Sequence, residues 1–138
     1  MSETTLVPHP VVLKADMSVF EAAHLILQHR ISGACVVDES RRLIGIVSEL
    51  DCMRLLLSAA YNDDEFVEGL VQDVMATTDL ETGSPGHDIV DVAMSMLDHK
   101  PRRRPVVDEG GGLIGQVTCR QILRAIKEVR GYKDLTER

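Results

Sequence analysis

The chain has 138 residues, 44% hydrophobic and 27% charged, a length and composition that suit a compact domain with its own core. Its formal net charge is -7, from 15 basic and 22 acidic residues, which argues against a general binder of nucleic acid or membrane surfaces. An anionic ligand held at a local basic patch stays possible. The N-terminus lacks signal-peptide character and no apolar run approaches membrane-spanning length, so we expect a cytoplasmic protein without membrane association.

The residue types that usually carry enzyme chemistry form no recognisable set. Cys35, Cys52 and Cys119 are an odd number without Cys-x-x-Cys spacing, so we expect reduced thiols packed in the interior. The five histidines have no metal-ligand spacing, and the chain has no P-loop, dinucleotide fingerprint or paired acid–base residues. The sequence therefore predicts no enzyme activity, no metal and no resident cofactor.

In chain order, a short strand near 11–13 is followed by an amphipathic helix. Apolar residues recur at helical spacing along one face of that helix: Val19, Ala22, Ala23, Ile26 and Leu27. Ser18 and Glu21 form a capping box at its start. The first unit thus opens with a strand and a helix.

Two β-branched runs, 34–38 and 43–48, come next and are joined by the turn sequence Glu-Ser-Arg-Arg. A second helix is predicted over 49–60. The acidic connector 61–75 is expected to carry a helical turn.

The same order then repeats seventy residues later. Between 36–54 and 106–124, nine of nineteen positions are identical without a gap. A second apolar stripe falls on Ile89, Val92, Ala93, Met96 and Leu97, with Asp88 as the cap.

Runs 104–108 and 113–118, joined by a glycine-rich turn that suits positive φ, precede a final helix over 119–130. The strand that should open this unit, near 80–82, is weakly encoded because its surroundings are polar. The sequence predicts an α+β fold of two β-α-β-β-α repeats packed about a pseudo-twofold axis. The expected divisions are a first repeat (1–61), a connector (62–75), a second repeat (76–130) and a C-terminal tail (131–138).

With these two units, the chain resembles a tandem pair of CBS domains, also called a Bateman module. The segments that carry the resemblance are "CVVDESRRLIGIVSELD" and "RRRPVVDEGGGLIGQVTCRQIL", each preceded by its amphipathic helix, and "DVM" before the second unit. The resemblance covers about residues 8–130. It implies a regulatory module that binds AMP, ADP, ATP, S-adenosylmethionine or another ligand, although some members bind nothing known.

In this family a Ser or Thr ends the last strand and an Asp three residues later accepts hydrogen bonds from a ribose diol. Ser48 and Asp51 match that pattern, whereas Thr118 is followed by Gln121, a poorer acceptor. The resemblance therefore implies one competent cleft and one doubtful cleft. Ser-x-x-Asp and Thr-x-x-Gln are also helix capping boxes, and that interpretation stays open beside the first.

Basic residues occur as a run at 100–104. In nucleotide-sensing relatives, phosphates beside one repeat's Asp are held by basic residues of the other repeat, at positions that correspond here to Arg102, Arg103 and Arg120. The resemblance therefore implies that these arginines and Asp51 serve one cleft and one nucleotide. The alternative is a solvated basic edge that discourages strand pairing.

The resulting hypothesis is a ligand-sensing module that binds an adenosine nucleotide and acts in trans on an effector protein, which the sequence does not name. A ligand-free interaction or oligomerisation module and an S-adenosylmethionine sensor are the alternatives. The apolar helix around "LLLSAA" favours burial in a homodimer interface.

Overall fold

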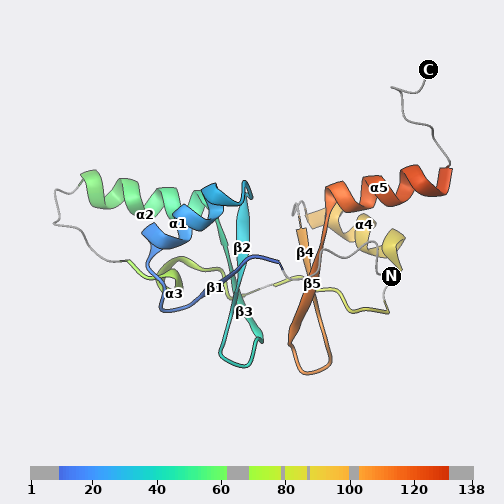
Figure 1. The fold of residues 1–138 in the computed structure, drawn as a ribbon, viewed down its shortest axis with the longest axis horizontal. Coiled ribbons are helices and arrows are strands. Elements are labelled where there is room, and N and C mark those ends of the chain that lie inside the picture. The colour runs from blue at the N-terminus through green and yellow to red at the C-terminus, as the bar shows by residue number, and fades with distance from the viewer. Residues whose placement is uncertain (1–9, 62–68, 79, 87, 100–102, 131–138) are drawn as a thin grey trace, which may run out of the picture. The chain divides into compact units, whose positions relative to one another are not determined.

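A computed structural model of the protein describes residues 10–61, 69–78, 80–86, 88–99 and 103–130. The chain divides into two compact units, one built mainly from 10–80 and the other mainly from 81–130. Both contain strands and helices in the predicted order, except that the second unit lacks its opening strand, and the mixed fold of two repeated units is confirmed (Figure 1). Within the described residues, no helix is long and apolar enough to cross a membrane.

The first unit contains a three-stranded sheet and three helices. Their bounds are β1 Val12–Lys14, α1 Val19–Gln28, β2 Gly33–Val37, β3 Leu43–Ser48, α2 Glu49–Tyr61 and α3 Val71–Val74. The strand order is β1-β2-β3, with β1 parallel to β2 and β2 antiparallel to β3. Helices α1 and α2 lie side by side (Figure 1). The short α3 is the helical turn that was predicted in the connector.

The core of this unit follows the predicted helical stripe, except that Leu27 of that stripe is 77% exposed. Leu13 of β1, Val36 of β2 and Val47 of β3 are fully buried, and they pack with Val19 and Ile26 of α1. Ser18 caps α1 by accepting a 3.0 Å hydrogen bond from the backbone N–H of Glu21. The sheet and helices therefore share one core, and the first turn of α2 extends from the end of β3.

The second unit contains α4 Ile89–His99, β4 Arg103–Val107, β5 Leu113–Thr118 and α5 Cys119–Arg130. Asp88 caps α4 by accepting a 2.9 Å hydrogen bond from the Val90 N–H, as predicted. The helix stripe again packs against the strands, but Leu97 of the predicted stripe is 74% exposed. The buried members of this core are Val92, Met96, Val106, Val117 and Ile122.

The prediction of a strand near 80–82 is wrong. That stretch is irregular, and a single parallel bridge joins Gly83 to Val106, seventy residues after the Leu13–Val36 pair of the first sheet. Two hydrogen bonds hold it, from the Gly83 N–H to the Pro105 carbonyl and from the Val107 N–H to the Gly83 carbonyl. Gly83 has no side chain to anchor a strand in the core as Leu13 does, so only the bridge remains.

The two hairpin turns share one backbone conformation although their residues differ. Gly111 has φ 83° and Arg41, seventy residues earlier, has φ 67°. Glycine adopts this left-handed region without cost, whereas arginine does so under mild strain. Asp38 stabilises the first turn, because its side chain accepts hydrogen bonds of 2.9 Å from the N–H groups of Ser40 and Arg42.

The prediction that all three cysteines are buried is wrong for Cys119. Cys35 and Cys52 are buried, but Cys119 lies exposed at the start of α5. Its repeat counterpart Glu49 is exposed in the same way, because the first residue of each final helix faces outward.

We expect a thiol-reactive maleimide to label one cysteine per native chain quickly and three after denaturation. Burial, and secondly the negative charge of Asp51, raise the pKa of the Cys52 thiol, so its reactive thiolate is scarce at neutral pH. Mass spectrometry of the labelled peptides identifies the site. Rapid native labelling of Cys52 or Cys35 would contradict the packing described.

Candidate ligand site

Ser48 and Asp51 form a closed capping box where β3 passes into α2. The Asp51 Oδ2 accepts hydrogen bonds from the Ser48 N–H at 2.8 Å and from the Ser48 hydroxyl at 2.9 Å. The Ser48 Oγ in turn accepts from the Asp51 N–H at 3.2 Å. The capping interpretation of this pair is therefore correct, and it fixes the carboxylate in one orientation.

The second carboxylate oxygen of Asp51 is engaged more weakly. Its Oδ1 lies 3.8 Å from Nη1 of Arg54, whose side chain is 78% exposed, so this ion pair is screened by solvent. A carboxylate has about four acceptor positions, and the two donors from Ser48 occupy those of Oδ2. Capping thus leaves Oδ1 able to accept a hydrogen bond from a ligand hydroxyl group.

Asp51 is also one of the residues that line a cavity of about 350 Å³ in the first unit. The cavity is lined by four polar or charged residues and two apolar ones: Asp51, Arg54, Leu55, Ser58, Asp73 and Val74. Asp73 lies in the first turn of α3, where its Oδ2 accepts a 2.9 Å hydrogen bond from the Leu70 N–H. Arg54, Ser58 and Asp73 were not predicted from the sequence as site residues. Asp73 reaches this cavity because α3 packs against α2.

The equivalent turn of the second repeat is built from a weaker pair. Thr118 Oγ1 accepts a 3.3 Å hydrogen bond from the Gln121 N–H at the start of α5. Both residues are half-buried. Gln121 brings an amide where Asp51 brings a charge, so the two turns differ chemically as the sequence indicated.

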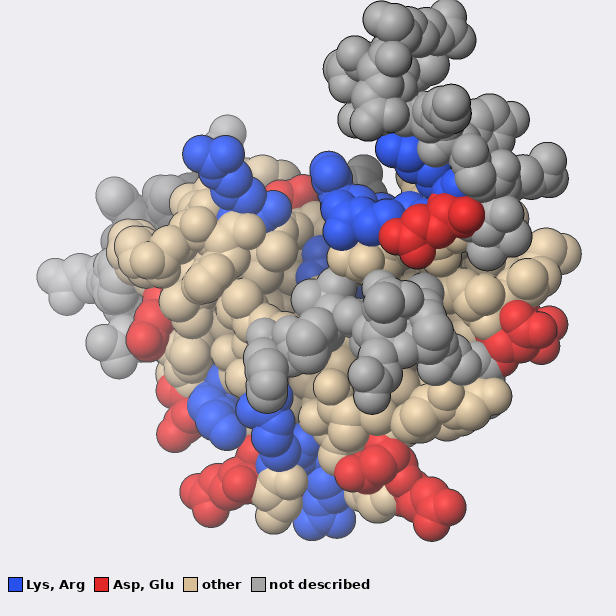
Figure 2. Space-filling view, turned by 45° about the vertical axis from the view of Figure 1, so that its right-hand side comes forward, with Lys and Arg blue, Asp and Glu red and all other residues tan. Residues whose placement is uncertain are grey.

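The predicted phosphate-binding arginines fall in different surroundings. Arg103 begins β4 and is half-buried, and Arg120 is exposed in the first turn of α5. Arg102 lies outside the described residues. Arg104 is buried, so a solvated basic edge is the wrong description of that position. Both acidic and basic side chains reach the surface on the face drawn in Figure 2.

Comparison with known proteins gives one consistent family. The profile of the CBS domain matches residues 4–58 and 71–128. Inosine-5'-monophosphate dehydrogenase of Halalkalibacterium halodurans is 33% identical over 96% of the chain, and the match spans 26% of that enzyme. The chain thus covers about a quarter of the length of this relative.

Solved structures show the same fold. CBSX2, a CBS-pair protein from Arabidopsis thaliana, was crystallised in complex with AMP; it has a TM-score of 0.80 and 28% identity, covering 91% of this chain and 95% of that one. The CBS domain pair of protein MJ0100, in complex with 5-methylthioadenosine and S-adenosyl-L-methionine, has a TM-score of 0.74 and 26% identity, covering 91% and 94%.

Proposed function

The chain belongs to the CBS-domain family, and we propose that it is a regulatory module that binds an adenosine nucleotide and acts on a separate partner protein. The observation that carries the proposal is the Asp51 carboxylate, which the Ser48 cap holds in place and which belongs to a residue lining a cavity. A fixed carboxylate is a good acceptor for a ribose hydroxyl. The AMP complex of CBSX2 supports the choice of an adenosine ligand.

A thermal denaturation screen tests this function. We expect AMP, ADP or ATP at millimolar concentration to raise the melting temperature, because a ligand that binds the folded state stabilises it by mass action. S-adenosylmethionine belongs in the same screen, since the MJ0100 pair was crystallised with it. Titration calorimetry should then give one ligand per chain. No stabilisation by any of the four would favour a ligand-free interaction module.

The arginines of the second repeat should separate phosphate recognition from nucleoside recognition. Replacing Arg102, Arg103 or Arg120 by alanine is expected to weaken AMP or ATP binding and to leave adenosine nearly unchanged. Calorimetry at two salt concentrations measures this, because screening weakens the attraction between the phosphate and the arginines. Equal losses for adenosine and AMP would mean that these residues do not contact the phosphate.

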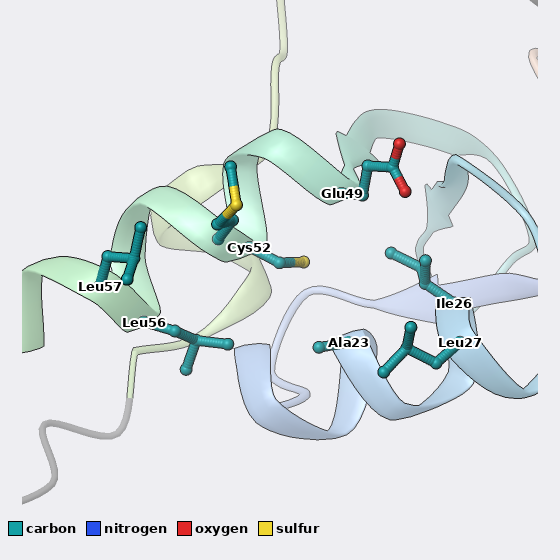
Figure 3. A pocket seen from close by; sticks show the side chains of 8 residues that line it. Ala23, Ile26, Leu27, Glu49, Cys52, Leu56 and Leu57 are labelled. Atoms are coloured by element: carbon teal, nitrogen blue, oxygen red, sulfur yellow. The ribbon is translucent and has the colours of Figure 1, made fainter. Parts of the chain in front are cut away.

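We also propose that two copies of the chain associate through the paired helices. In the first unit, α1 and α2 leave an apolar groove of about 310 Å³ between them, and the Cys52 thiol extends from α2 into that groove (Figure 3). Both units expose apolar side chains at equivalent positions seventy residues apart, and all of them are 51–77% exposed. The pairs are Phe20 and Val90, Leu27 and Leu97, and Met53 and Leu123. A second copy of the chain presents the same exposed apolar surfaces, and an isologous interface is formed by the same surface on both copies.

Light scattering should therefore show a dimer at micromolar concentration, and Leu27→Asp should convert it to a monomer. Leu27 lines the groove and is 77% exposed. A charge there stays solvated in the monomer but loses water at an interface, which is costly. Leu50→Asp is the matched control, because Leu50 is 57% exposed and does not line the groove. A monomeric wild-type chain would rule out this interface.

A further inference from the structure

Arg104 occupies an unusual position in the second unit. It is the second residue of β4, and only 4% of its surface is exposed. Its Nη2 donates a 3.0 Å hydrogen bond to the hydroxyl of Ser95 on α4. Its Nε is buried and has no hydrogen-bond partner. The guanidinium group is therefore held in place by one neutral contact and retains an unused donor.

The internal repeat shows that the fold does not need a polar pair here. Seventy residues earlier, Ala34 stands in the place of Arg104 and Leu25 in the place of Ser95. Ala34 is 1% exposed, and Leu25 packs against the first core. In the first unit, an apolar pair thus fills the equivalent positions between strand and helix. The polar pair of the second unit calls for a reason other than packing.

A bound anion would offset the buried charge of Arg104. Arginine stays charged at any ordinary pH, and a buried charge without a counter-charge is strongly unfavourable. Arg42–Asp38 and Arg54–Asp51 are ion pairs among the described residues, and neither of them involves Arg104. The Nε–H and Nη2–H of a guanidinium lie along one edge, and that edge matches two oxygens of a phosphate or carboxylate.

We propose that Arg104, positioned by Ser95, forms an oxyanion-binding subsite in the second repeat for a phosphate group. Because Nε is shielded from bulk solvent, attraction between the guanidinium and the anion is stronger there than at the surface. The phosphate can be inorganic or can belong to a nucleotide. The subsite does not depend on Asp51, so it can be tested whether or not the chain binds adenosine.

The test uses the apolar pair of the first repeat as a replacement. The double variant Arg104→Ala/Ser95→Leu installs in the second unit the residues that the first unit already uses. It removes a buried charge without opening an unfilled space, so it should fold and melt at or above the wild-type temperature without added anion. Melting temperatures are measured with increasing inorganic phosphate, AMP or adenosine, with sodium chloride holding ionic strength constant.

We expect phosphate or AMP to raise the wild-type melting temperature by about 3–8 °C near ten times its dissociation constant, and the double variant to lose this shift. A loss with inorganic phosphate identifies a site for the free ion, and a loss with AMP alone identifies a nucleotide phosphate. Ser95→Leu alone serves as the packing control. Equal shifts in wild type and double variant, or no shift in either, would overturn the subsite. Stabilisation by adenosine that the double variant retains would support the proposed function independently.

Discussion

Asp51→Ala is expected to weaken the binding of adenosine, AMP and ATP alike, by about 10- to 150-fold. Each of these ligands presents the same ribose diol, and each would lose the same charged acceptor. A hydrogen bond to a charged group contributes about 1.5–3 kcal/mol, which corresponds to that range of affinity. Titration calorimetry on the folded variant measures the dissociation constants directly. Gln121→Ala, at the equivalent position of the second repeat, should change them little.

The double role of Asp51 requires a control for its cap. Removing the carboxylate also removes two hydrogen bonds to Ser48, so the variant should lose about 1 kcal/mol of stability. Ser18→Ala removes the cap of α1, with a single 3.0 Å bond to the Glu21 N–H, and should cost a similar amount without changing affinity. If Asp51→Ala lowers the melting temperature as Ser18→Ala does and binds nucleotide normally, then Asp51 is only a cap.

Most of the fold could be predicted because local chemistry and the repeat agree. The strand bounds 43–48 and 113–118 were right, since each run of β-branched residues is bracketed by a hairpin turn and a helix cap. The positive φ of Arg41 could have been inferred from Gly111, its repeat counterpart. The prediction of a strand near 80–82 was wrong because it transferred the position of the first strand by the repeat spacing. That spacing does not show whether Gly83 can anchor a strand in the core.

The candidate site could be predicted in part, for a physical reason. Ser48 and Asp51 were identified, but a capping box and a ribose acceptor use the same residue types at the same spacing, so sequence alone does not separate the two roles. Asp73 was missed because only the folded structure shows that it lines the same cavity as Asp51. The burial of Arg104 was missed because consecutive arginines are usually solvated; Ala34 at the equivalent position was the available signal.

Leu13→Ala should be among the most destabilising single substitutions in the first unit. Leu13 is fully buried in β1, pairs with Val36 in the sheet and packs in the first core. Deleting a buried leucine side chain to alanine costs about 2–5 kcal/mol, which is a large share of the roughly 5–15 kcal/mol that stabilises a domain. Urea unfolding followed by circular dichroism should show a clearly lower midpoint at unchanged protein concentration.

Leu50→Ala makes the same chemical change on an exposed helical position, 57% exposed, and should alter stability by about 0.5 kcal/mol or less. Equal destabilisation by the two variants would contradict the placement of Leu13 in the core. The shape of the transition carries further information, because Gly83 leaves the second unit without an equivalent anchor. If the two units unfold together, Leu13→Ala shifts one single transition. If they unfold separately, it shifts one of two transitions, and the unshifted one belongs to the second repeat.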